Sequence, residues 1–163
     1  MERVAVVDDD PVFLMMMRDA LRPLGVEVLT YNDSNSAFPS LIQSQPDLII
    51  LDLRMPAVAN GWHVLDLLWL DPLTRTIPVI VCSAAKEELN ANSQWLHRRG
   101  VAILPKPFAL DDLYRAIETG TGRYLSVSGQ ETRPSVAAPA DTVNAGADSL
   151  TDSTELELGA GPS

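Results

Sequence analysis

Four aspartates of this 163-residue chain have the residue type and spacing to bind a divalent cation. Asp8, Asp9 and Asp10 are consecutive and follow one apolar run, and Asp52 follows another. Carboxylates that lie close together raise one another's pKa values unless a cation lies among them. Hard oxygen ligands favour Mg²⁺, with Mn²⁺ as the second choice. We therefore expect a Mg²⁺ or Mn²⁺ site held partly by Asp8 and Asp9.

A lysine and a hydroxyl extend this chemistry to phosphoryl transfer. Lys106 lies between two prolines after a later apolar run, and Ser83 follows another. A lysine and a cation neutralise phosphoryl oxygens, a hydroxyl donates a hydrogen bond to one of them, and a carboxylate attacks phosphorus in line. Asp52 is the predicted nucleophile, because the adjacent Asp8 and Asp9 are better placed as a metal-binding pair.

Strands and helices in strict alternation are predicted to position these groups. Strands are expected at residues 3–7, 26–31, 47–51, 77–82 and 101–104, and helices at 12–21, 36–43, 62–70, 86–98 and 110–118. Alternation predicts βαβ units and a parallel α/β sheet with helices on both faces, and the apolar strands 47–51 and 77–82 are expected near its centre. Ligands of such sheets bind at the carboxyl ends of the strands, where the polar residues converge.

Two interpretations of the first helix follow from its sequence. Asp10 followed by Pro11 is typical of a helix N-cap and first helical position, so Asp10 is interpreted as a cap rather than a metal ligand. The run Met15, Met16 and Met17 lies in an amphipathic stretch and is interpreted as core packing.

Four motifs in combination resemble the response-regulator receiver domain, the acceptor half of two-component phosphorelays. They are VAVVDDDP at 4–11, PDLIILDLRMP at 46–56, VIVCSAA at 79–85 and PKPF at 105–108. The resemblance covers residues 1 to about 121 and implies a flavodoxin-like, doubly wound five-stranded parallel sheet in the order 2-1-3-4-5. It also implies the Mg²⁺ ligands, which are Asp9 and Asp52 directly, Asp8 through water, and the backbone carbonyl of Arg54.

The same resemblance implies a signalling role rather than an enzyme with its own substrate. A sensor histidine kinase or histidine phosphotransfer protein would donate the phosphoryl group to Asp52, and a downstream protein would read the phosphorylated state. The only chemistry expected of the chain is its own phosphorylation and autodephosphorylation. Homodimer formation is left open.

Three features depart from the family pattern. Ile103 occupies the position, three residues before Lys106, where relatives carry an aromatic residue that moves when the domain is phosphorylated. The loop between Pro56 and Gly61 is one residue longer than the common spacing, so the surroundings of Asp52 are expected to differ. No DNA-binding or catalytic output domain is recognisable after the receiver segment.

Composition sets the domain boundary and excludes some partners. Residues 1–123 are expected to form the receiver domain, and 124–163 a disordered acidic tail rich in Ser, Thr, Ala and Pro. A net charge of −10 argues against nucleic acid as a partner. No apolar run approaches the roughly 20 residues of a membrane span, so a soluble cytoplasmic protein is expected. Cys82 is the single cysteine, which excludes an internal disulfide.

Two alternative functions compete with phosphoacceptance. A phosphatase resembling the haloacid dehalogenase class would use Asp8 as nucleophile and Asp10 as acid/base. That hypothesis leaves Asp52 unexplained and lacks a second acidic pair at a later strand end. A receiver scaffold that binds partners without phosphorylation is favoured by Ile103 and the longer loop, but the complete polar set argues against it.

Overall fold

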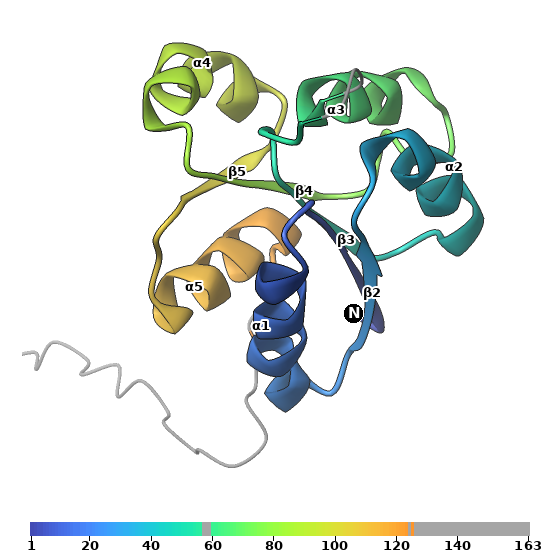
Figure 1. Cartoon of the computed structure of the whole chain (residues 1–163), viewed down its shortest axis with the longest axis vertical. Helices are drawn as coiled ribbons and strands as arrows, with labels where there is room; N and C mark the ends of the chain where they lie inside the picture. Colours follow the sequence, from blue (N-terminus) through green and yellow to red (C-terminus); the bar gives the residue numbers. More distant parts are fainter. Residues whose placement is uncertain (57–59, 124, 126–163) are drawn as a thin grey trace, which may run out of the picture. The chain divides into compact units, whose positions relative to one another are not determined.

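Five parallel strands form one sheet in the computed structural model, which describes residues 1–56, 60–123 and 125 (Figure 1). The strands are β1 (Arg3–Val7), β2 (Glu27–Tyr31), β3 (Leu48–Leu51), β4 (Val79–Ser83) and β5 (Ala102–Pro105). Their order is β2-β1-β3-β4-β5, so β3 is central and β4 is interior. The flavodoxin-like order and the predicted positions of β3 and β4 are both confirmed.

Helices cover both faces of this sheet, as predicted (Figure 1). They are α1 (Pro11–Leu21), α2 (Ser34–Ser44), α3 (Gly61–Leu70), α4 (Lys86–Arg98) and α5 (Leu110–Thr121), with a short 3₁₀ turn at Arg22–Leu24. Helices α1 and α5 pack on one face, and α2, α3 and α4 pack on the other. The protein is therefore a three-layer α/β/α sandwich in the part of the chain that the structure describes.

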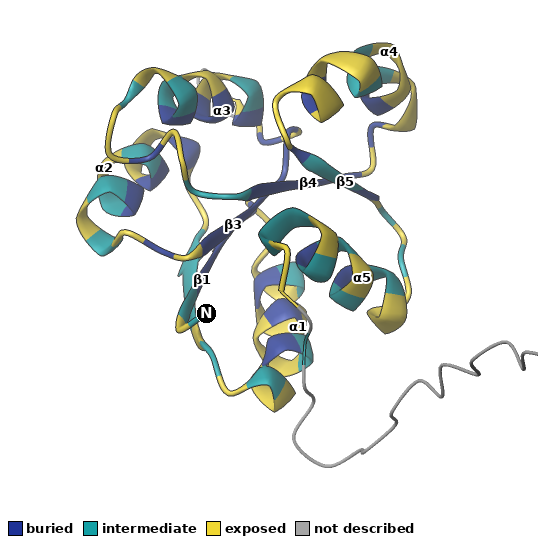
Figure 2. Cartoon of the chain, turned by 180° about the vertical axis from the view of Figure 1, so that it is seen from behind, coloured by how far each residue is buried: buried dark blue, intermediate teal, exposed yellow. Residues whose placement is uncertain are grey.

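Side chains of each inner strand alternate between two hydrophobic cores. In β3, Leu48 and Ile50 pack with α1 and α5, whereas Ile49 and Leu51 pack with the other three helices. All four residues of β3 are buried (Figure 2). Burial on both faces explains why this strand is an uninterrupted apolar run instead of an alternating one.

Capping residues fix where the helices begin. The side chain of Asp10 accepts a hydrogen bond from the Val12 N–H at 2.8 Å, and Pro11 occupies the first turn of α1. Asp10 is therefore a helix cap, as predicted. Because α1 begins directly after it, Asp8 and Asp9 lie in the short connection between β1 and α1.

Several element boundaries differ from the predicted ones for local reasons. Helix α2 begins at Ser34, two residues early, because Asp33 caps it through the N–H groups of Asn35 and Ser36. Strand β4 begins at Val79, two residues late, because the Ile77 N–H donates to a turn with Thr74 and Pro78 has no N–H. The strand ends at Ser83, one residue later than predicted.

The interpretation of all three methionines as core packing is wrong for two of them. Met17 is fully buried, but Met15 and Met16 are 62% and 46% exposed. The buried residues of α1 are Leu14, Met17 and Leu21, which are spaced to lie on one helix face. Met15 and Met16 fall on the opposite, solvent-facing side.

Two predictions concern residues that the structure does not describe. The altered loop includes residues 57–59, and the acidic tail spans 124–163, of which only Leu125 is described. Leu125 packs against the α1–α5 core, and its N–H donates to the Glu118 carboxylate at 3.0 Å. No helix among the described residues is long and apolar enough to cross a membrane.

Candidate functional site

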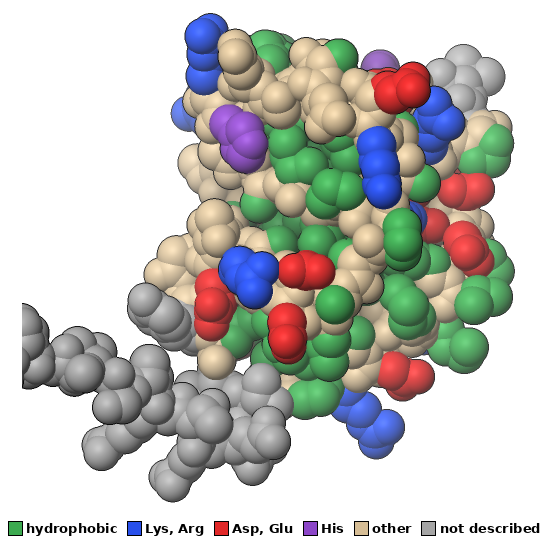
Figure 3. Space-filling view, turned by 90° about the vertical axis from the view of Figure 1, so that its left-hand side faces the viewer, with side chains coloured by type: hydrophobic (Ala, Val, Ile, Leu, Met, Phe, Trp, Pro, Cys, Tyr) green, Lys and Arg blue, Asp and Glu red, His purple; other side chains and the backbone are tan. Residues whose placement is uncertain are grey.

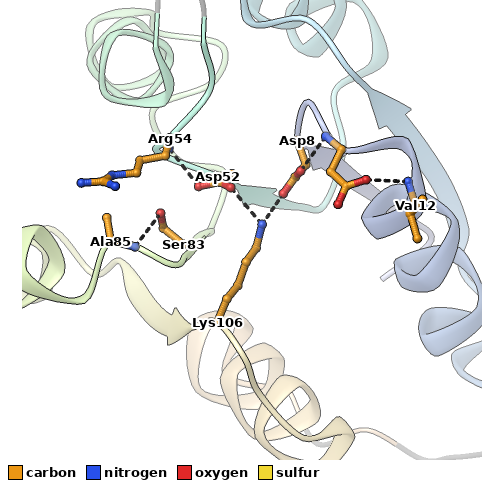
Figure 4. Close-up of polar contacts among 8 residues, drawn as sticks. Asp8, Val12, Asp52, Arg54, Ser83, Ala85 and Lys106 are labelled. Atoms are coloured by element: carbon orange, nitrogen blue, oxygen red, sulfur yellow. Dashed lines mark hydrogen bonds and ion pairs between the residues drawn. The ribbon is translucent and has the colours of Figure 1, made fainter.

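Four strand ends meet at one edge of the sheet and bring the predicted polar residues together (Figure 4). Backbone hydrogen bonds continue past the regular strands and fix these ends. The Asp52 N–H donates to the carbonyl of Val7 at 2.9 Å, and the Lys106 N–H donates to the carbonyl of Ser83 at 2.9 Å. The sheet ladder itself therefore positions the candidate nucleophile and the candidate lysine.

Lys106 joins two of the carboxylates. Its Nζ donates to Asp8 Oδ2 and, at 2.9 Å, to Asp52 Oδ2. Asp8 and Asp52 are almost completely buried, with 1% and 7% of their surface exposed. The predicted convergence of β1, β3 and β5 at this edge is thus found in atomic contacts.

The other oxygen of each carboxylate accepts a backbone hydrogen bond. The N–H of Asp10 donates to Asp8 Oδ1 at 2.9 Å, and the N–H of Arg54 donates to Asp52 Oδ1 at 2.9 Å. Each donor lies two residues beyond its acceptor, as in an Asx-turn. Both carboxylates are therefore fixed in orientation by their own loops and by Lys106.

Burial and charge shift the pKa values in this cluster. Burial raises the pKa of Asp8, and the hydrogen bonds from Lys106 and Asp10 only partly offset that effect. Burial alone lowers the pKa of Lys106, but the hydrogen bonds and charges of Asp8 and Asp52 outweigh it, so its pKa lies above the ordinary value. Lys106 is therefore positively charged at neutral pH.

The donor set fits a divalent cation. One carboxylate oxygen from each of Asp8, Asp9 and Asp52 lies within 4.8 Å of the others. Three carboxylates against the single ammonium of Lys106 leave two negative charges, which a divalent ion balances. Oxygen-only ligands at this spacing suit Mg²⁺. The Arg54 carbonyl lies in the turn after β3, and its role as a ligand stays a prediction.

Ser83 and Ile103 lie on the β4 and β5 side of the site. Ser83 is fully buried, and its Oγ accepts a long hydrogen bond, 3.4 Å, from the Ala85 N–H. Ile103 is half-buried in β5 and packs against the core that contains α4. An aliphatic side chain therefore occupies the position at which the family pattern has an aromatic one.

Two residues at the site were not singled out from the sequence. The ring centroid of Phe13 lies 3.7 Å from Lys106 Nζ, which is a cation–π contact. A Cβ at Gly61 would lie 1.9 Å from the carbonyl oxygen of Asp52, so only glycine fits there. The isolated glycine at the start of a helical pattern was the available signal for close backbone approach. Phe13 carried no comparable signal.

A hollow lies beside the site between α4, β5 and α5 (Figure 3). Its volume is about 670 Å³, and its lining includes Ile103, Phe108 and Ala116 together with the charged Asp112 and Arg115. Figure 3 shows hydrophobic side chains in the middle of this face with charged groups around them. Strand β5, which carries Lys106 at its end, forms part of the hollow.

Residues 4–118 match the family model of the response regulator receiver domain. The transcriptional regulatory protein KdpE of Mycobacterium tuberculosis is 30% identical over 161 residues, which cover 97% of this chain and 68% of KdpE. PrrA of the same organism is 34% identical over 71% of this chain and 48% of its own length. Protein PilH of Pseudomonas aeruginosa is 29% identical over 72% of this chain and 95% of PilH.

Solved structures give the same match. The receiver domain of the sensor histidine kinase PA1611 from Pseudomonas aeruginosa has a magnesium ion coordinated in its active-site cleft. It is 26% identical, with a TM-score of 0.64 over 75% of this chain and 98% of that domain. Vibrio cholerae CheY4, at 24% identity and a TM-score of 0.63, shares the fold.

Proposed function

This chain belongs to the response regulator receiver domain family, and we propose that Asp52 is its phosphoacceptor in a two-component phosphorelay. The observation that carries the proposal is the position of Lys106 Nζ, which contacts Asp8 and Asp52 together. A nucleophilic carboxylate, a cation-binding carboxylate pair and a fixed ammonium group then surround one point at the sheet edge. Receiver domains of two-component systems interact with histidine kinases, so the donor is a phosphohistidine on such a kinase or on a phosphotransfer protein.

The transfer uses groups that are already oriented. An oxygen of Asp52 attacks phosphorus in line, the bond from phosphorus to the donor imidazole nitrogen breaks, and the imidazole keeps that electron pair. Lys106 neutralises one phosphoryl oxygen, and the Ser83 hydroxyl donates a hydrogen bond to another. Bound at Asp8, Asp9, Asp52 and the Arg54 carbonyl, Mg²⁺ would supply further neutralisation of phosphoryl charge. Attack by water on phosphorus later releases phosphate and restores the carboxylate.

Output follows from a change in protein–protein contacts. A phosphoryl group adds charge beside β4 and β5 and biases the loops and helices that follow these strands. Strand β5 lines the hollow between α4, β5 and α5, and Lys106 follows directly after this strand. A downstream protein bound in the hollow would therefore sense this change. We assign the protein to the cytoplasm, where histidine kinases present their phosphohistidine, and give it no enzymatic role beyond its own phosphorylation and dephosphorylation.

Intact-mass measurement with a small phosphodonor tests the proposal. Wild type, Asp52→Asn and Asp10→Asn are incubated with Mg²⁺ and acetyl phosphate. Wild type is expected to gain a single phosphoryl group and Asp52→Asn none. Asp10→Asn is the matched control, because it removes a neighbouring charge while asparagine keeps the helix cap, and it should behave as wild type.

Two outcomes would contradict the proposal. Failure of wild type to gain a phosphoryl group would favour a scaffold that binds partners without phosphorylation. Gain of a phosphoryl group by Asp52→Asn, together with its loss in Asp10→Asn, would favour the phosphatase-like use of Asp8 and Asp10.

A further inference from the structure

All three tryptophans of the chain lie in one cluster between α3 and α4. The ring centroids of Trp69 and Trp95 are 4.8 Å apart, and those of Trp62 and Trp95 are 6.1 Å apart. The guanidinium carbon of Arg99 lies 4.5 Å from the Trp69 centroid and 4.8 Å from that of Trp95. Side chains from two helices therefore form a continuous aromatic contact on this face of the sheet.

Glu88 connects the tryptophan cluster to the loop of Asp52. Its Oε1 accepts a hydrogen bond from Trp62 Nε1 at 2.6 Å, and its Oε2 lies 3.7 Å from Arg54 Nε. These three side chains line a hollow next to Asp9. One carboxylate in the first turn of α4 thus holds both the indole and the guanidinium.

Arg54 is tied to Asp52 through its backbone. Its N–H donates to Asp52 Oδ1, whereas its side chain extends toward the β4–α4 connection, on the side of Ser83 and Ala85 (Figure 4). The side chains of Arg54 and Glu88 are 71% and 36% exposed, and an ion pair at that exposure contributes little net stability. A phosphoryl group close by can therefore compete for the guanidinium, since it carries more negative charge than one carboxylate and offers oxygens that Arg binds bidentately.

We propose that Glu88 is the residue that couples the phosphorylation state of Asp52 to α4, because its carboxylate contacts both Arg54 and Trp62. A phosphoryl group on Asp52 attracts the Arg54 guanidinium away from Glu88. The released carboxylate then changes its contact with the Trp62 indole and shifts the packing of Trp62 on Trp95, which belongs to α4. This inference rests on the proposed phosphorylation of Asp52 and names the side chains that respond to it.

Intrinsic fluorescence measures this step directly, because every tryptophan of the protein is in the cluster. The full-length chain is treated with Mg²⁺ and acetyl phosphate, and tryptophan emission and intact mass are recorded on the same samples. Wild type is compared with Glu88→Gln, Arg54→Gln and the control Glu87→Gln. Glu87 is exposed and lies in the same first turn of α4, so its substitution removes an equal charge from an equivalent place.

The expected result is an emission change in wild type that follows the phosphorylated fraction. Glu87→Gln should keep this change, whereas Glu88→Gln and Arg54→Gln should lose most of it at the same phosphorylated fraction. An unchanged emission in phosphorylated wild type would overturn the inference and leave the proposed function intact. An equal response in Glu88→Gln and Glu87→Gln would also overturn it. Absence of a phosphoryl group in wild type would remove the proposed function and this inference with it.

Discussion

Lys106 is the residue on which the charge balance of the site depends. It is the one cation that contacts the buried carboxylates of Asp8 and Asp52 among the described residues. The ring of Phe13 covers the ammonium group of Lys106 from the side of α1. The contacts of its Nζ with Asp8 and Asp52 therefore explain a lysine between two prolines at a strand end.

Replacing Lys106 by Met is expected to lower the free energy of unfolding by about 3 kcal/mol at neutral pH, because two buried carboxylates lose their counter-charge. The difference in free energy of unfolding between wild type and Lys106→Met should shrink as the pH falls. The pKa of Asp8 is already raised above 3.8, so the folded state takes up a proton before the unfolded state does, and protonation removes the repulsion. Urea denaturation of Lys106→Met at neutral and mildly acidic pH measures both effects.

The control for this prediction is Lys86→Met. Lys86 is exposed at the start of α4, so its replacement should change stability little at either pH.

In wild type, the pKa of Lys106 is raised, so its contribution to the free energy of unfolding persists up to its ordinary pKa of 10.5 and is lost as the pH rises further. If Lys106→Met lowers the free energy of unfolding no more than Lys86→Met does, Lys106 is not the counter-charge of Asp8 and Asp52.

Gly61 is expected to be irreplaceable, because any Cβ there collides with the Asp52 carbonyl. Gly61→Ala should cost about 1 to 3 kcal/mol in stability, as for other small-to-large changes at closely packed positions, and should slow phosphorylation of Asp52. Gly120→Ala in α5 is the matched control. Its Cβ would meet only ordinary contacts at 3.5 Å or more, and it should raise stability by about 0.5 to 1 kcal/mol. Thermal denaturation of the two variants checks the opposite signs.

At the scale of secondary-structure elements, the site residues follow the carboxyl ends of the strands. Capped helix N-termini then fix the connections in which these residues lie. The β1–α1 connection contains the acidic run, and its last member, Asp10, is used up as the cap of α1. Asn60 caps α3 in the same way, directly before the glycine that packs on Asp52. Capping chemistry and site chemistry therefore share neighbouring residues at this edge.

Asp10 as a helix cap and Asp10 as the acid/base of a phosphatase predict different effects of its substitution. Asp10→Ala should lower the free energy of unfolding by about 1 kcal/mol, and Asp10→Ser should restore most of it, because serine caps a helix nearly as well. Both variants should still accept a phosphoryl group on Asp52. A phosphatase that used Asp10 as its acid/base would lose activity in Asp10→Ser, so retention of phosphorylation with restored stability separates the two roles.

Strand β5 carries one of the departures from the pattern that the family resemblance implies, and it lies beside α4. With Ile103 in β5, the usual aromatic group is missing beside the hydroxyl of Ser83. The three tryptophans lie between α3 and α4, where Glu88 links Trp62 to the turn after β3. Phosphorylation-dependent amide exchange is therefore expected to be strongest in α4 and in the adjoining part of α3.

For the whole molecule, alternation of apolar runs and amphipathic stretches was sufficient to predict a parallel α/β sheet. The strand order came from the resemblance carried by the four motifs, since periodicity alone does not order strands. Convergence of Asp8, Asp52 and Lys106 followed from the rule that ligand-binding residues gather at the carboxyl ends of parallel strands. The buried contacts among them confirm that convergence.

Sequence could not supply contacts that depend on helix rotation and side-chain direction. Glu88 and Trp62 are 26 residues apart in different helices, and nothing in their spacing predicts a hydrogen bond. Phe13 meets Lys106 only because α1 turns that position toward the site. Exposure of Met15 was mispredicted for the same reason, because the face of α1 that packs on the sheet is narrower than the apolar run.

Cation binding should stabilise the whole domain, because the proposed metal ligands Asp8, Asp9 and Asp52 lie in the connections that follow β1 and β3. At free Mg²⁺ about ten times its Kd, linkage gives about 1.4 kcal/mol of added stability. Melting curves with increasing Mg²⁺ should rise for wild type and Asp10→Asn, and should respond much less for Asp9→Asn. A chelator should reverse the gain. Equal stabilisation of all three proteins would place the cation elsewhere.

Locating the acyl phosphate on the chain tests most directly whether Asp52 is the phosphoacceptor. Wild type phosphorylated with acetyl phosphate and Mg²⁺ is treated with borohydride, which reduces an aspartyl phosphate to homoserine, and the position is read by peptide mass spectrometry. If Asp52 is the phosphoacceptor, homoserine is expected at position 52 alone. Homoserine at position 8 or 9, or none in a chain whose intact mass shows a phosphoryl group, would contradict it.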